Sequence, residues 1–245
     1  MAQKGIAIWS DAREIADHLA DVMKETMDGK RGGEPLNIAL SGGSTPKEIF
    51  DQLSWHHQKS LPWERIRFFQ VDERCVPPDD PESNIKMLHA ALFSRLDILP
   101  DHIFRICGED HPESEAKRYG KILAMNLPAE SEWPVFDLIL LGLGEDGHTA
   151  SLFPGDVKNL NSANCCEVAV HPRSGQKRIT LTMPVINRAK QVVFLVTGPG
   201  KAEIVREIIQ FPGKNRYPAS QVRPVSGNLS WLLDSDASKM LNLES

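Results

Sequence analysis

The most informative segment of this sequence is Phe136-Asp-Leu-Ile-Leu-Leu-Gly-Leu-Gly-Glu-Asp-Gly-His-Thr-Ala-Ser-Leu-Phe-Pro-Gly155. Its apolar run, Leu138 to Leu141, predicts a strand that is buried on both faces. Three glycines follow within six residues, and glycines at a strand end let the chain turn sharply and let a ligand approach the backbone. Asp146 and His148 lie inside this turn, at the edge of the sheet where α/β proteins bind ligands. The stretch therefore predicts an acid/base pair at the carboxyl end of a buried strand.

The same three glycines also match the dinucleotide-binding motif G-x-G-x-x-G, and Glu167 lies about twenty residues further on, where that motif has an acid. Two features argue against a nucleotide site. Glu145 and Asp146 would point negative charge at a pyrophosphate, and Pro154 follows too soon for the helix that should bind the phosphates. We therefore expect no nucleotide or other cofactor.

The segments on either side of this stretch alternate between strand-like and helix-like patterns. Strands are predicted at about residues 5–9, 36–40, 65–71, 103–106, 136–141, 191–197 and 231–233, with further extended segments at 167–170 and 178–183. Helices are predicted from Ser10 as cap, over 46–53, over 84–96 with Ser83 as cap, over 112–127 and over 202–210. Repeated βα units predict a three-layer α/β fold with a mainly parallel, Rossmann-like sheet covered by helices on both faces.

Composition bounds the class of protein. A chain of 245 residues with 41% hydrophobic content can bury one large core, and we expect a single domain over residues 1–245. The net charge of −5 and the pI near 5.9 argue against a nucleic-acid surface, which needs a basic face. Neither a signal peptide nor an apolar run of membrane-spanning length is visible, so we expect a cytoplasmic monomer without membrane contact.

The loop Ser41-Gly-Gly-Ser-Thr45-Pro46 joins a predicted strand to a predicted helix. Pro46 is suited to the first helical position and Thr45 to the cap. Free amides at a helix start, opened by Gly42 and Gly43 and flanked by the hydroxyls of Ser44 and Thr45, can bind an anion. The sequence leaves this reading and an ordinary capped helix equally open.

Charged residues follow two more strands. Asp72, Glu73 and Arg74 end the strand at 65–71, where they are either a surface cluster or part of a site at the sheet edge. Lys201 lies near a predicted helix start, where a cation opposes the helix dipole and a bound anion would justify it. Arg178 and Arg173 are further cations that such a site could use.

The cysteines and histidines give weaker signals. Cys75, Cys107, Cys165 and Cys166 show no C-x-x-C spacing, which favours reduced, structural thiols. A metal site at Asp146 and His148 would need a third ligand with recognisable spacing, so we expect no metal.

These loops together resemble those of the 6-phosphogluconolactonase family, the lactonases of the oxidative pentose phosphate pathway. The matching segments run in order over about two thirds of the chain. They are Ser41-Gly-Gly-Ser44, Val71-Asp-Glu-Arg74 with Val76-Pro77, Gly142-Leu-Gly-Glu-Asp-Gly-His-Thr-Ala-Ser-Leu-Phe-Pro154, Arg178-Ile-Thr-Leu-Thr-Met-Pro184 with Asn187, and Gly198-Pro-Gly-Lys201. The run from Asp146 to Pro154 is the specific one; the glycine loop alone is not.

A more distant resemblance reaches glucosamine-6-phosphate deaminase, which shares the fold and the Asp-Gly-His turn. That family has a glutamate just after the histidine that works with the imidazole in ring opening, and Phe153 stands at the matching position here. This departure disfavours a deaminase or isomerase of amino-sugar phosphates. A non-enzymatic sugar-phosphate sensor is the other alternative, but it would want a DNA-binding segment, and the first strand begins by about Gly5.

The resemblance implies hydrolysis of 6-phospho-D-glucono-1,5-lactone, an ester that needs a water, a base and oxyanion stabilisation. His148 matches the family's proposed general base, and an imidazole suits neutral pH. Asp146 then orients His148, Arg74 stabilises charge and Asp72 contacts sugar hydroxyls. The phosphate is expected on the loop Gly42, Gly43, Ser44 and Thr45, with positive charge from Arg178 and Lys201.

Overall fold

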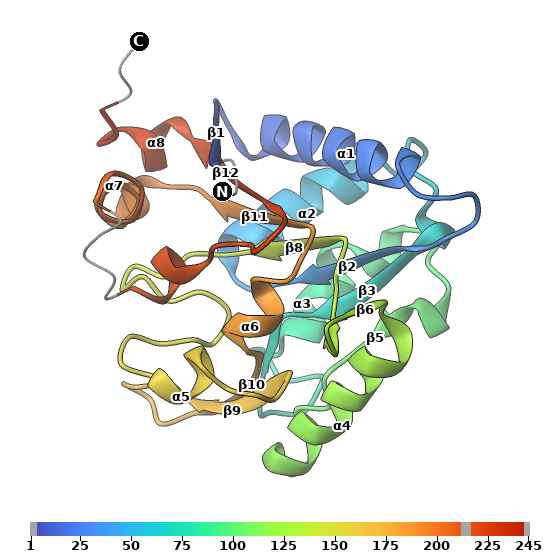
Figure 1. The fold of residues 1–245 in the computed structure, drawn as a ribbon. Coiled ribbons are helices and arrows are strands. Elements are labelled where there is room, and N and C mark those ends of the chain that lie inside the picture. Colours follow the sequence, from blue (N-terminus) through green and yellow to red (C-terminus); the bar gives the residue numbers. More distant parts are fainter. Residues whose placement is uncertain (1–3, 212–216, 243–245) are drawn as a thin grey trace.

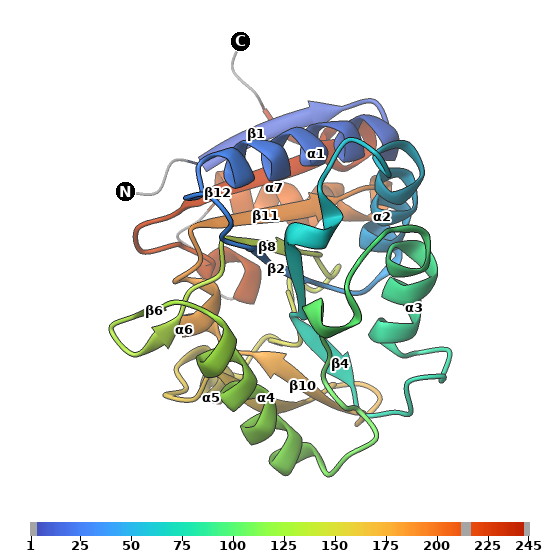
Figure 2. The ribbon, with the colours of Figure 1, turned by 90° about the vertical axis from the view of Figure 1, so that its right-hand side faces the viewer.

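The computed structural model describes residues 4–211 and 217–242, and its centre is a seven-stranded sheet (Figures 1 and 2). Every pair of neighbouring strands in this sheet is parallel. In spatial order the strands are β1 (Lys4–Trp9), β12 (Asn228–Asp234), β11 (Gln191–Val196), β8 (Leu138–Leu141), β2 (Leu36–Leu40), β3 (Ile66–Gln70) and β5 (Ile103–Phe104).

Helices cover both faces of the sheet, each over its own apolar core. One core joins α1 (Ala12–Asp28), α2 (Ser44–His56) and α3 (Asn84–Ala91) to alternate strand residues such as Leu138 and Leu140. The other joins α4 (Pro112–Asn126), α6 (Met183–Ile186), α7 (Ala202–Gln210) and α8 (Ser235–Ser238) to Ile139 and Leu141. Because side chains of a strand alternate between its faces, the unbroken apolar run of β8 serves both cores. The predicted three-layer α/β fold is confirmed.

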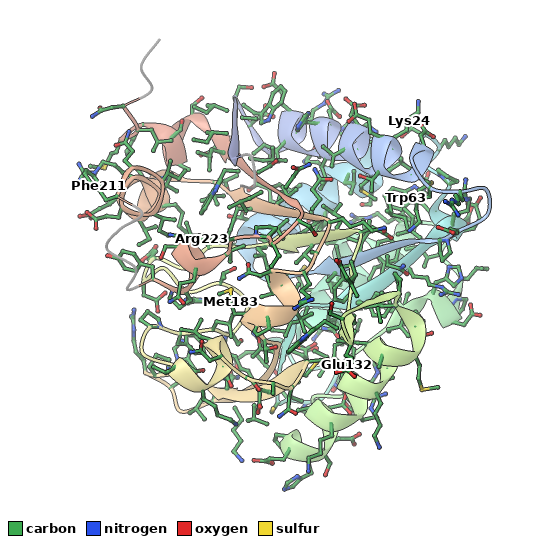
Figure 3. The ribbon with its side chains drawn as sticks, in the orientation of Figure 1. Lys24, Trp63, Glu132, Met183, Phe211 and Arg223 are labelled. Carbon is green, nitrogen blue, oxygen red and sulfur yellow. The ribbon has the colours of Figure 1, made fainter. Side chains whose placement is uncertain are left out.

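The side chains sort as this layering requires (Figure 3). Lys24 lies on the outer face of α1 and is exposed, whereas Trp63 and Met183 are almost fully buried, one in each core. No helix within the described ranges is both long and apolar enough to span a membrane.

A smaller antiparallel sheet stands beside the main one, in the order β4 (Asp72–Arg74), β10 (Lys177–Leu181) and β9 (Cys166–Val170). The chain enters β4 directly after β3, so the small sheet begins at the carboxyl edge of the large one. Figure 1 shows β9 and β10 below the main sheet, next to α4 and the short helix α5 (Val157–Leu160). The two extended segments expected near residues 167–170 and 178–183 are therefore strands, but of a separate sheet. The hairpin of β6 (Ala129–Glu130) and β7 (Trp133–Pro134) was not expected.

Three predicted helix ends are wrong. The cap of α1 is Asp11, whose side chain accepts bonds from the amides of residues 13 and 14, and not Ser10. Helix α2 begins at Ser44 after Gly43, so Thr45 is not its cap and Pro46 is its third residue. The positive φ of Gly43, 110°, turns the chain into the helix earlier than the proline signal indicated. Helix α3 ends at Ala91, and a separate 3-10 turn follows over Phe93–Arg95.

The strand order places a switch point between β2 and β8. From β2 the chain moves outward through β3 to β5, and from β8 it moves the other way through β11 to β12. Loops that follow β2 and β8 therefore diverge to opposite sides and leave a crevice at the carboxyl ends of these strands. The glycine loop at 41–45 and the turn that contains His148 both open onto this crevice.

Candidate active site

A pocket of about 200 Å³ lies at the switch point. Its walls come from the loop after β2, from β4, from the first residue of α3, from the turn after β8, from β10 and from the 3-10 turn Pro199–Lys201 before α7. These segments are spread over some 160 residues of sequence, and the parallel sheet together with the small antiparallel sheet brings them to one pocket.

His148 is held by Asp146 at the pocket wall. Its Nδ1 lies 2.5 Å from Oδ1 of Asp146, and the same oxygen accepts a bond from the His148 backbone amide at 3.2 Å. Burial raises the pKa of Asp146, but the hydrogen bonds and charge of His148 outweigh this effect and leave that pKa below its usual value. An ionised Asp146 that accepts a hydrogen bond from Nδ1–H leaves Nε2 as the basic nitrogen. Within the described residues, Nε2 has no hydrogen-bond partner.

Gly144 allows this pair to form. A side chain at residue 144 would put its Cβ 2.1 Å from Nδ1 of His148 and 2.7 Å from Oδ1 of Asp146. The amide of Gly144 also donates to the carbonyl of His148 at 2.8 Å, which closes the turn. The glycine is needed because the imidazole and its carboxylate lie directly over the backbone.

Phe153 packs against the other side of the imidazole. The two ring centroids are 5.0 Å apart, and Phe153 is 3% exposed. The guanidinium of Arg178 covers the same phenyl ring at 5.6 Å from its centroid. The residue beside His148 is therefore apolar and enclosed, and it offers no proton acceptor.

The glycine loop presents an open helix start to the pocket. Helix α2 has no side-chain cap, so the first amides of a 13-residue helix are left for a ligand. Ser41 adds a hydroxyl that is buried without a hydrogen-bond partner, while Thr45 Oγ1 lies 2.9 Å from Thr197 Oγ1 of the neighbouring loop. The loop matches an anion site better than an ordinary capped helix, because the cap is missing.

Arg74 and Arg178 lie directly opposite each other on β4 and β10. Burial, followed by the charge of Arg74, lowers the pKa of Arg178. Like charges in this position destabilise a strand pair. Arg74 donates to the carbonyl of Glu82 and Arg178 donates to Gln176 at 3.3 Å, but neither forms a salt bridge within the described residues. An anion bound between or beside them would relieve their mutual repulsion.

Lys201 is the third cation of the pocket. Burial lowers its pKa, and the carboxylates of Glu145 and Asp146 act in the opposite direction. Lys201 forms no ion pair with any residue of the described ranges. A half-buried ammonium without a close counterion is costly unless a ligand supplies the charge.

Asp72 faces the pocket but is almost fully buried, with 5% exposure. Ser151 donates its hydroxyl to Oδ2 of Asp72 at 2.6 Å, and the amide of Asn84 approaches Oδ1 at 3.4 Å. The buried carboxylate therefore has one firm donor and one oxygen that a substrate hydroxyl can approach.

Glu73 points away from the pocket and has a structural role. Its carboxylate accepts from the backbone amides of Arg74, Asn84 and Ile85 and from the side chain of Gln70. Burial raises its pKa against these hydrogen bonds. Glu73 fixes the start of α3. The sequence left open whether residues 72–74 form a surface cluster or part of a site; in the structure Glu73 is a buried structural acid, while Asp72 and Arg74 line the pocket.

The cysteines and the possible metal ligands lie elsewhere. All four cysteines are free, and burial raises the pKa of Cys75 to about 11, which makes its thiol unreactive. Among the described residues, Cys107, Asp110 and Glu115 come close enough together to hold a metal ion. Glu115 is already bonded to Arg118, however, and none of the three lines the pocket.

The structure brings nine of the ten predicted site residues to the pocket wall: Gly42, Gly43, Ser44, Thr45, Asp72, Arg74, His148, Arg178 and Lys201. The tenth, Asp146, lies behind His148. Arg173 is exposed and does not line the pocket. Sequence reasoning missed the pocket residue Asn84 and the contact of Ser151 with Asp72. Ser151 lies inside the quoted motif, but no sequence signal connects it to a residue 79 positions earlier.

Comparisons with known proteins agree on one family. The family model described as glucosamine-6-phosphate isomerases/6-phosphogluconolactonase matches residues 10–231 of this sequence. A protein named 6-phosphogluconolactonase from Treponema pallidum is 44% identical over 205 residues, which cover 84% of each chain. The solved 6-phosphogluconolactonase of Trypanosoma brucei is 31% identical with a TM-score of 0.83, over 98% of this chain and 100% of that one.

A monomeric glucosamine-6-phosphate deaminase of known structure has the same fold. Its TM-score is 0.79 over 97% of this chain and 100% of that one, and its identity is 22%. This likeness concerns the arrangement of helices and strands alone.

Proposed function

The chain belongs to the family of glucosamine-6-phosphate isomerases and 6-phosphogluconolactonases, and from this premise we propose that its pocket hydrolyses 6-phospho-D-glucono-1,5-lactone to 6-phospho-D-gluconate. The protein is a carboxylic ester hydrolase of the oxidative pentose phosphate pathway. The observation that carries the choice between the two activities of the family is Phe153, which packs against the His148 ring. Ring opening of an amino sugar would need an acid at this place.

His148 acts as the general base. Nε2 takes a proton from water as the water attacks the lactone carbonyl, and Asp146 stabilises the imidazolium that forms. The tetrahedral oxyanion then expels the ring oxygen, which receives the proton back from His148. The 2.5 Å contact between Asp146 and Nδ1 supports this role, because it fixes the tautomer that leaves Nε2 basic.

The phosphate is the binding handle. The uncapped start of α2, the loop Gly42 to Thr45, Arg178 and Lys201 supply amides, hydroxyls and positive charge for a dianion. Arg74 stabilises the oxyanion, and Asp72 accepts from a sugar hydroxyl. The lack of salt bridges to these cations within the described residues supports an anion-binding role for all three, since their charge is not used elsewhere.

Acid release from freshly made lactone tests the function. The wild-type protein should accelerate acid release well above spontaneous opening, equally in EDTA, and release no ammonia from glucosamine 6-phosphate. Hydrolysis at only the background rate would refute the lactonase. Activity that EDTA removes and zinc or magnesium restores would refute the water mechanism without a metal.

We further propose that residues 1–245 form one domain that acts as a cytoplasmic monomer. The continuous seven-stranded sheet supports the single domain, because both apolar cores are built on it. Sedimentation at increasing protein concentration should give one species of about 27.3 kDa. A dimer that persists on dilution would contradict this proposal.

A further inference from the structure

Ser151 connects the His148 turn to the small antiparallel sheet. Its side chain is fully buried, and its hydroxyl donates to Oδ2 of Asp72 at 2.6 Å. Its backbone amide donates to Oγ1 of Thr180 at 3.2 Å, and Thr180 is the cross-strand partner of Asp72. The residue that lies three positions after His148 is thus attached to the strand pair that carries both pocket arginines.

The Asp72 carboxylate could pair with the Ser151 hydroxyl or with a pocket arginine, and in the structure it accepts from Ser151. It lies two residues before Arg74 on β4, and Arg178 lies on the paired strand β10. Both arginines line the same pocket as Asp72, yet Asp72 forms no salt bridge with either in the part of the chain that the structure describes. The negative charge of Asp72 nevertheless acts on Arg178. Burial and the charge of Arg74 lower the pKa of Arg178, and Asp72 opposes this lowering.

We propose that Ser151 is a positioning residue, which holds the Asp72 carboxylate in place and thereby keeps Arg178 available to the phosphate of the substrate. The proposal rests on the function proposed above, in which Arg178 binds that phosphate. Ser151 is not a nucleophile in this scheme, since its buried hydroxyl is already donated to Asp72.

The physical reason is competition for one cation. A buried carboxylate needs hydrogen bonds, and Asn84 at 3.4 Å is a weak substitute for the hydroxyl at 2.6 Å. Without the Ser151 hydroxyl, the strongest donors on the strand pair that carries Asp72 are the guanidinium groups of Arg74 and Arg178. An Asp72–Arg178 ion pair would neutralise the charge that a phosphate needs, so substrate binding would suffer while the His148–Asp146 pair stays intact.

The first test is Ser151→Ala, read by steady-state kinetics and by calorimetric titration with inorganic phosphate. KM for the lactone and the phosphate dissociation constant should each rise roughly tenfold, as expected for a hydrogen bond to a charged group, while kcat stays within about twofold. Ser151→Cys, which keeps the size and a weak donor, should give a smaller rise than Ser151→Ala.

Ser54→Ala is the matched control. Ser54 is also fully buried, its hydroxyl donates to the carbonyls of Asp51 and Ala91, and it does not line the pocket. Its loss should leave KM and phosphate affinity unchanged. This control separates the removal of any buried hydroxyl from the removal of the one that holds Asp72.

A double-mutant cycle with Asp72→Asn decides whether Ser151 acts through Asp72. An amide cannot capture a guanidinium as an ion pair, so Ser151→Ala should weaken phosphate binding no further in the Asp72→Asn background. Equal effects of Ser151→Ala in both backgrounds would overturn the proposal, and so would an unchanged phosphate affinity or a fall in kcat alone. Failure of the wild-type protein to hydrolyse the lactone would instead refute the proposed function, while the cycle on inorganic phosphate still reports on Ser151.

Discussion

The two ends of strand β8 carry the same kinds of side chain in opposite states. At the amino end, Asp137 is 1% exposed and its carboxylate accepts from Lys30, from Lys190 at 2.9 Å and from the amide of Asn37 at 2.9 Å. At the carboxyl end, four residues of apolar strand away, three cations line a pocket without a salt bridge to any described residue. The lysines of the first group are held in close ion pairs, whereas the three cations of the second group have carboxylates near them but no ion pair with any described residue.

The presence or absence of an ion pair separates structural charges from functional ones. Burying a charge is costly unless a partner compensates it, so an uncompensated cluster persists where a ligand supplies the partner. Asp137 is a buried charge that is compensated. Burial raises its pKa, but Lys30, the Asn37 amide and Lys190 outweigh this effect and lower it. We therefore expect changes at the amino end to reduce stability, and changes at the carboxyl end to reduce activity.

The largest effect should follow His148→Asn. Asparagine keeps a polar group of similar reach but cannot take a proton, so kcat should fall by about 10²–10⁴-fold with little change in KM. The rate must be corrected for spontaneous lactone opening, and the melting temperature should match that of the wild type. A folded variant that keeps most of its kcat would remove His148 from the mechanism and leave Asp72 as the next base to test.

The second effect belongs to the other end of β8. Asp137→Asn leaves two lysines without their carboxylate, one of them almost fully buried, and should lower the free energy of unfolding by about 3–5 kcal/mol. Urea denaturation measures this loss, and kcat of the folded protein should be unchanged. A similar loss of kcat and of stability in this variant would break the proposed separation of the two ends.

The pH dependence of this loss provides a control. Because the folded state lowers the pKa of Asp137, its stabilisation is fully present above the ordinary value of 3.8 and is lost as the pH falls through the folded value. The stability difference between wild type and Asp137→Asn should therefore be constant near neutral pH and shrink in acid. A difference that grows on acidification would have the wrong sign for this ion pair.

The two ends also differ in how far they can be predicted from the sequence. The glycine turn after β8 can be predicted from the sequence, because glycines, an acid and a histidine follow an apolar run. The parallel sheet then brings His148 and the 42–45 loop to one edge. Asp137 stands in the same quoted stretch, yet its partner Lys30 is 107 positions away, near the start of the connection between α1 and β2, where no motif marks it. The contact between Ser151 and Asp72 cannot be seen in the sequence for the same reason. Local signals reveal residues that turn the chain, while contacts across the fold require the strand register.

The third effect concerns substrate affinity. Lys201→Ala removes a charge-assisted contact to the phosphate and should raise KM by a factor that corresponds to about 2 kcal/mol, with a smaller change in kcat. Lys190→Ala is the matched control, because it removes a lysine at the amino end of the sheet and should leave KM unchanged. If unphosphorylated gluconolactone were hydrolysed with the same kcat/KM, the phosphate would not be the binding handle.

The smallest expected effect is on stability, and it uses inorganic phosphate as the missing anion. Phosphate at ten times its dissociation constant should stabilise the wild-type protein by about 1.4 kcal/mol, because it binds the folded pocket and not the unfolded chain. For a chain of this size that is a rise in melting temperature of about 3–6 °C. Phosphate also stabilises proteins in general by exclusion from their surface, so the comparison between variants carries the argument.

Asp137→Asn should melt lower but keep the full phosphate-dependent rise, since its pocket is intact. Lys201→Ala should start near the wild-type melting temperature and lose most of the rise. Equal shifts in all three proteins at matched ionic strength would mean that the three cations of the pocket do not act as the anion site, and that their lack of salt bridges has another cause.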